Sequence, residues 1–157
     1  MKDLIEKIAK EPKTANKRTI ARLAAVQAIY QMDIGETSLE TILAEFLDHR
    51  LGKEIEGDQY LPADHDFFSQ ILKGVIKYQL EIDPLIDNSL NEDWKVTQID
   101  STMRAILRAG IYELIFRKDI PKKVAINEYV EIAKSFFDEK TSGMINAVLD
   151  KISKLET

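Results

Sequence analysis

The most informative absence in this sequence of 157 residues is cysteine, of which there is none. Without a thiol the chain can form no disulfide, bind no zinc or iron–sulfur cluster through sulfur, and supply no cysteine nucleophile. Glycine is also scarce, and the 6 glycines lie too far apart to form the GxGxxG or GxxxxGK loops that cradle phosphates. Several enzyme classes are therefore excluded, and we expect no cofactor.

Long hydrophobic runs are missing as well. Residues 1–10 contain no apolar run of signal-peptide length, and no stretch approaches the roughly 20 apolar residues that a membrane span requires. We therefore expect a cytoplasmic protein with no membrane partner. A chain of this length that is 45% hydrophobic and 31% charged can bury one core without help from a metal or a disulfide.

Apolar residues recur three and four positions apart along nearly the whole chain, and no segment keeps the strict alternation of a half-buried strand. The pattern predicts an all-α protein, a compact helical bundle of about seven helices. The expected helical segments are 13–34, 37–49, a segment from 64 or 66 through 76, 83–91, a segment from 97 limited by Pro121, 122–137 and 141–155, with a loop at 50–62.

Capping residues mark several of the expected helix starts. A capping box at 37–40 opens one helix, and Asp64 or Asp66 caps the next. Asp83 followed by Pro84 predicts a separate short helix, because aspartate is a preferred N-cap and proline suits the first helical position.

Charge is distributed unevenly along the chain, although the net charge is only -5. Residues 1–30 carry 7 basic and 3 acidic side chains, residues 31–93 carry 4 and 15, and residues 94–157 carry 11 and 9. A Debye length of about 8 Å screens the acidic middle from a ligand bound elsewhere. The acidic total therefore does not exclude a nucleic-acid binder.

The basic end also contains an amide and an aromatic side chain. Cations can contact phosphates while aromatic rings and guanidinium planes stack on unpaired bases, as in single-stranded RNA binding. An equally acceptable interpretation is a solvated helix start with a buried tyrosine. The candidate residues are Lys13, Lys17, Arg18, Arg22, Gln27 and Tyr30.

Catalytic and metal sites are not indicated. His49 and His65 lack the Glu-x-x-His pattern of di-iron bundles, and neither accompanies a GxSxG serine. The aspartates beside His65 are typical of a helix N-terminus, where they cap the helix without any metal. We assign no catalytic residue and expect no enzyme.

Five segments in order and with matching spacing, 21–30, 100–114, 121–128, 133–136 and 146–151, resemble the bacterial transcription antitermination factor NusB family. The resemblance covers roughly residues 16–154. It implies two three-helix subdomains within an RNA-binding domain at 16–157. Residues 1–15 are an unmatched extension, either a short helix or flexible.

The resemblance implies a factor without catalytic activity that pairs with the ribosomal protein NusE. The pair binds the single-stranded boxA element of nascent ribosomal RNA within the RNA polymerase antitermination complex. Arg18 and Arg22 correspond to the family's arginine-rich helix start, with Tyr30 and Phe136 as aromatic contacts. Met144 stands where an aromatic is common.

The chain departs from the family pattern next to those arginines. Thr19 and Ile20 occupy positions where further arginines are usual, so Lys13 and Lys17 are the candidates to supply the missing charge. These missing arginines also favour an alternative, a protein-only adaptor that does not bind RNA.

A NusB-like domain also precedes the catalytic domain of some ribosomal RNA cytosine methyltransferases. The length, the absence of cysteine and the absence of a glycine-rich loop argue against that alternative.

Neighbouring phenylalanines are expected to differ in role. At about 100° per residue, Phe137 shares a helix face with Ile126, Val130 and Ala133, whereas Phe136 lies at the edge of that face. We therefore expect Phe137 in the core and Phe136 free to stack on a base. Structural roles are expected for Arg104 and Arg108, whose stems pack while they pair with acidic residues, and for Asn127 and Glu128, as an interhelical hydrogen-bond pair.

Overall fold

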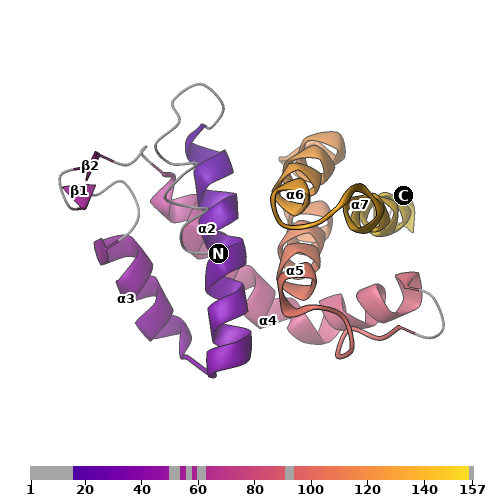
Figure 1. Cartoon of the computed structure of the whole chain (residues 1–157), viewed down its shortest axis with the longest axis horizontal. Helices are drawn as coiled ribbons and strands as arrows, with labels where there is room; N and C mark the ends of the chain where they lie inside the picture. Colours follow the sequence, from indigo (N-terminus) through magenta and orange to yellow (C-terminus); the bar gives the residue numbers. More distant parts are fainter. Residues whose placement is uncertain (1–15, 50–53, 56–57, 60–62, 91–93, 156–157) are drawn as a thin grey trace. The chain divides into compact units, whose positions relative to one another are not determined.

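A computed structural model describes residues 16–49, 54–55, 58–59, 63–90 and 94–155 (Figure 1). The helices within these ranges are α2 (Lys17–Gly35), α3 (Leu39–His49), α4 (His65–Ser89), α5 (Ser101–Phe116), α6 (Lys122–Phe136) and α7 (Glu139–Leu155). The all-α class is confirmed. The helix count is six in the described part rather than about seven, because the two helices expected between 64 and 91 are assigned as one. The extension at 1–15 lies outside the described residues.

Within the expected loop at 50–62, the described residues form a two-residue antiparallel ladder. Strand β1 (Glu54–Ile55) pairs with β2 (Asp58–Gln59). None of the described helices is both long and apolar enough to cross a membrane.

The chain divides into two compact units, and the division falls inside α4, after Lys73. In the first unit, α2 packs on α3, and the rings of Phe46 and Phe68 stack with centroids 5.4 Å apart. The start of α4 is tied to the start of α2, because the Asp64 N–H donates to the Lys17 carbonyl at 3.1 Å. This connection places two helix starts beside each other.

In the second unit, α5, α6 and α7 pack together (Figure 1). Tyr129 of α6 and Leu149 of α7 are fully buried. Glycines allow two close approaches. A Cβ on Gly110 would lie 3.1 Å from Leu149, and one on Gly74 would lie 2.0 Å from the Tyr112 ring. These two glycines therefore set how closely the helices around them can pack.

Most helix starts follow the expected capping chemistry. Asp64 caps α4, its Oδ1 accepting from the Phe67 N–H at 2.9 Å. Ser38 rather than Thr37 caps α3, because its hydroxyl accepts from the Thr41 N–H at 3.2 Å. Asp100 caps α5 by accepting from two backbone N–H groups.

The expected helix start at Asp83 and Pro84 is wrong. Both residues lie inside α4, and the break in helical geometry is at Tyr78, with φ -108° and ψ 15°. The Asp83 carboxylate instead accepts two hydrogen bonds from Arg108, at 2.9 and 2.8 Å. A strong tertiary partner thus takes the carboxylate that the local pattern assigned to a cap.

Candidate nucleic-acid interface

The start of α2 presents exposed basic side chains in the first unit. Asn16 caps the helix, its Oδ1 accepting from the Thr19 N–H at 2.8 Å. Lys17 and Arg18 follow at once, both are exposed, and the Arg18 side chain keeps 46% of its surface in solvent. Lys13, expected to add charge here, lies outside the described residues.

Arg18 is held against the start of α4. Its Nε lies 3.6 Å from Asp64 Oδ2, and its Cζ lies 4.5 Å from the centroid of the Phe67 ring. A guanidinium over an aromatic face is attracted by the ring quadrupole. The group therefore has a preferred position while remaining accessible from outside.

Arg22 and Gln27 are interior residues. Each is only 2% exposed, because ten consecutive residues of α2, from Ile20 to Ile29, are buried. The expectation that Arg22 lies at an exposed helix start is therefore wrong. Its Cζ lies 4.9 Å from the centroid of the Phe67 ring. Gln27 Oε1 is buried without a hydrogen-bond partner in the described part of the chain.

The amphipathic pattern could not reveal this burial. A helix that is covered on most sides shows no simple polar face, so charged and polar positions within it are not automatically at the surface. Tyr30 follows the buried stretch and is half-buried. This partial burial is compatible with both a stacking ring and a core residue.

In the second unit, the two neighbouring phenylalanines lie at the end of α6. Phe136 is its last residue, and Phe137 has extended geometry, with φ -131° and ψ 165°. Both are half-buried, and their ring centroids are 6.5 Å apart.

The expectation that Phe137 is a core residue is wrong, because the helix ends before it and the helical angle no longer applies. The buried face of α6 consists of Ala125, Tyr129, Ile132 and Ala133.

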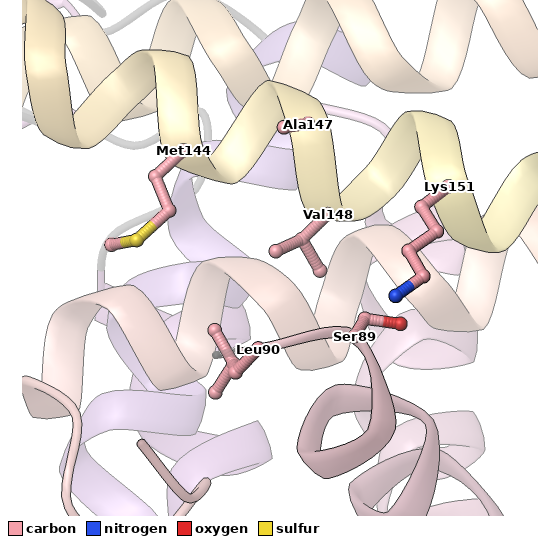
Figure 2. Close-up of a pocket in the computed structure, with 6 residues that line it drawn as sticks. All are labelled: Ser89, Leu90, Met144, Ala147, Val148 and Lys151. Carbon is pink, nitrogen blue, oxygen red and sulfur yellow. The ribbon is translucent and has the colours of Figure 1, made fainter. Parts of the chain in front are cut away.

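Met144 is exposed and lines a pocket of about 170 Å³ in the second unit (Figure 2). Residues of α7 form one wall, and Ser89 with Leu90, at the end of α4, forms the other. The Lys151 side chain extends from the α7 wall, and its ammonium donates to the Asn88 carbonyl at 3.4 Å. The Ser89 hydroxyl is buried without a partner among the described residues.

This pocket combines a soft thioether, apolar side chains, one cation and one hydroxyl. Such a surface suits a flat, partly polar ligand next to an anionic group. The sequence pointed to Met144 alone. Its spacing from Val148 and Lys151 was compatible with one helix face, but nothing in the sequence placed Ser89 opposite them.

Arg104 and Arg108, in the segment 100–114, make structural contacts. The expectation that Arg108 pairs with an acidic residue is confirmed, because its partner is Asp83, and Arg108 is 8% exposed. Arg104 donates to the carbonyls of Val96 and Ile99, at 2.9 and 3.1 Å.

The described residues include no group of three or more His, Cys, Asp or Glu side chains arranged to hold a metal. His65 is exposed at the first position of α4.

Comparison with known proteins gives consistent matches over nearly the whole chain. The NusB family matches residues 19–154. The transcription antitermination protein NusB of Rhizobium etli is 54% identical over 149 residues, which cover 95% of this chain and 93% of that protein.

Solved structures agree. The structure of T. maritima NusB has a TM-score of 0.74 at 31% identity, covering 90% of this chain and 93% of that one. A structure of the antitermination factors NusB and NusE in complex with dsRNA has a TM-score of 0.71 at 23% identity, covering 86% and 94%.

Proposed function

Since this chain belongs to the NusB family, we propose that it is a transcription antitermination factor that binds boxA-type RNA together with NusE. The observation that carries the RNA-binding part is the exposed Lys17 and Arg18 pair at the start of α2. Cations at this position can contact phosphates of a single strand. We place the activity in the cytoplasm, in the RNA polymerase antitermination complex, and without catalysis.

The proposed RNA contacts fall into two groups. In the first unit they are Lys13, Lys17, Arg18 and Tyr30, and in the second unit they are Phe136 and Met144 with the neighbouring Lys151. Arg22 and Gln27 are each 2% exposed, so we do not include them among the proposed direct contacts. The residues 1–15 are proposed to be an extension of a NusB-like domain at 16–157.

The partner NusE is supported by charge as well as by family. Residues 31–93 carry 15 acidic and 4 basic side chains, which complement the basic surface expected of a ribosomal protein. Complementary charge of this kind accelerates association more than it tightens the complex.

The test is a titration of fluorescent RNA with the protein alone, with NusE alone and with both. We expect the mixture to bind a boxA-containing RNA more tightly than either protein does and more tightly than a scrambled RNA of equal composition. Equal binding of the two RNAs would contradict boxA recognition. Co-elution with NusE and no RNA binding by the mixture would favour the protein-only adaptor.

A further inference from the structure

The starts of α2 and α4 are joined by a backbone hydrogen bond and also by side-chain contacts of Asp64. The Asp64 N–H donates to the Lys17 carbonyl at 3.1 Å, while the Asp64 side chain divides its two oxygens between separate tasks. Oδ1 accepts from the Phe67 N–H at 2.9 Å, and Oδ2 lies 3.6 Å from Arg18 Nε. The hydrogen bond to its own helix thus fixes the position of the carboxylate that contacts Arg18.

The Phe67 ring forms the second part of this contact. It is 1% exposed, and the guanidinium carbons of Arg18 and Arg22 lie 4.5 and 4.9 Å from its centroid. These arginines are four residues apart on α2, so their side chains share one helix face and their charges repel. The aromatic ring attracts both cations and so offsets this repulsion.

Arg18 differs from Arg22 in accessibility. Arg22 is buried, but the Arg18 side chain is 46% exposed although it contacts Phe67. Asp64 approaches from the Nε side, so the opposite edge of the guanidinium, with Nη1 and Nη2, is the edge suited to a phosphate. An arginine whose planar group is already oriented loses less side-chain freedom when it forms a bidentate contact.

We infer that Phe67 is a positioning residue for RNA binding, which holds the Arg18 guanidinium over its ring in the orientation that receives a phosphate. This inference rests on the proposed RNA-binding function. According to this inference, the buried Phe67 side chain affects RNA affinity as well as stabilising the core. Phe68, the next residue, packs on Phe46 and provides a comparison within the same helix.

The test is a double-mutant cycle with Arg18→Ala and Phe67→Leu, measured as the dissociation constant for boxA RNA in the presence of NusE. A cation–π contact at an exposed site corresponds to about a two- to fivefold change in affinity. Phe67→Leu is expected to weaken RNA binding by that factor in the wild-type background and to have no further effect when Arg18 is already alanine.

Phe68→Leu is the matched control, since Phe68 is 0% exposed and makes its ring contact with Phe46. Its effect on RNA affinity is expected to be the same with and without Arg18. Equal effects of Phe67→Leu in both backgrounds would overturn the inference, because Phe67 would then act through the core alone. Phe67→Met replaces Phe67→Leu if the leucine variant does not fold, since methionine adapts to irregular core space.

A readout without RNA separates this inference from the proposed function. NMR relaxation of the Arg18 Nε–Hε group is expected to show restricted motion in the wild type and faster motion in the Phe67 variant. Unchanged Arg18 motion would overturn the inference even if the protein binds RNA. Failure of the wild type to bind RNA, with Arg18 still ordered by Phe67, would overturn the proposed function and leave the positioning contact intact.

Discussion

At the scale of single residues, the same side-chain chemistry has different consequences depending on burial. Arg18, Arg22 and Arg108 are all arginines on helices, yet one is exposed, one lies within the buried part of α2, and one forms a bidentate pair with Asp83. The charge pattern identified the basic helix start but could not rank its members. Ranking required knowing that α2 is covered from Ile20 to Ile29.

The Arg108–Asp83 pair is the ion pair whose loss we expect to matter most for stability. The Arg108 side chain is 9% and Asp83 22% exposed, so removing the carboxylate leaves a largely buried guanidinium without that partner. Asp83→Ala is expected to lower the free energy of unfolding by about 3 kcal/mol. Urea denaturation measures the change.

The control is Glu131→Ala, which removes the exposed Lys134–Glu131 pair, with side chains 56% and 69% exposed. Pairs of this kind contribute about 0–1 kcal/mol. Similar losses for the two variants would show that the Asp83 pair is no more than a surface contact.

At the scale of elements, the periodicity of apolar residues located the helices well, because it reflects local geometry. Helix starts at Asp64 and the bounds of α6 and α7 lie close to the expected positions. The failures occurred where a tertiary contact intervened. Asp83 pairs with Arg108 instead of capping a helix, and Phe137 lies just beyond the last residue of α6.

The candidate site was less predictable than the fold for the same reason. Lys17, Arg18 and Met144 could be found from residue type and family resemblance, and all three are exposed. Phe67 and Ser89 could not be found in this way, because their roles depend on contacts with segments that are distant in the sequence. A single sequence contains no local signal for such a contact.

Substitutions of Gly74 and Gly143 are expected to change the free energy of unfolding in opposite directions. A Cβ at Gly74 would lie 2.0 Å from the Tyr112 ring, whereas one at Gly143 meets nothing within 4 Å. Gly74→Ala is expected to lower the free energy of unfolding by about 1–2 kcal/mol through overpacking. Gly143→Ala is expected to raise it by about 0.5–1 kcal/mol, because alanine favours the helix.

Thermal or urea denaturation of both variants is the measurement. A stabilising Gly74→Ala substitution would contradict the close approach of α4 and α5 in the second unit.

The cap of α7 predicts a specific pH dependence. Asp138 Oδ1 accepts from the Thr141 N–H at 2.9 Å, and hydrogen bonds to Thr141 lower the pKa of Asp138 from its ordinary 3.8. A carboxylate with a depressed pKa in the folded state stabilises the fold above its unfolded pKa and loses this effect as the pH falls through its folded pKa.

Asp138→Asn keeps a capping oxygen but removes the charge. We therefore expect the wild type to be the more stable protein at neutral pH and the difference to shrink as the pH falls below about 4. Denaturation curves across this pH range measure it. A stability difference that does not change with pH would contradict a charged cap.

At the scale of the whole molecule, function depends on where charge is placed rather than on its total. The net charge of -5 conceals a basic first 30 residues and an acidic segment at 31–93. The basic part suits a polyanion and the acidic part suits a basic protein partner. One acidic chain therefore carries charge suited to both proposed partners, RNA and NusE.

We propose that the start of α2 binds RNA phosphates through exposed cations, with Arg18 as a principal contact. The most direct test is the salt dependence of boxA RNA binding, measured with NusE present from about 50 to 200 mM salt for the wild type and for Arg18→Ala. Each neutralised phosphate contributes about -0.7 to the slope of log affinity against log salt for a single strand.

We predict weaker binding by Arg18→Ala and a slope shallower by about 0.7. The melting temperature is expected to fall by no more than about 4 °C, because the contacts of this exposed side chain with Asp64 and Phe67 contribute little to stability. A slope identical to that of the wild type, or an affinity that does not depend on salt in either protein, would contradict the account.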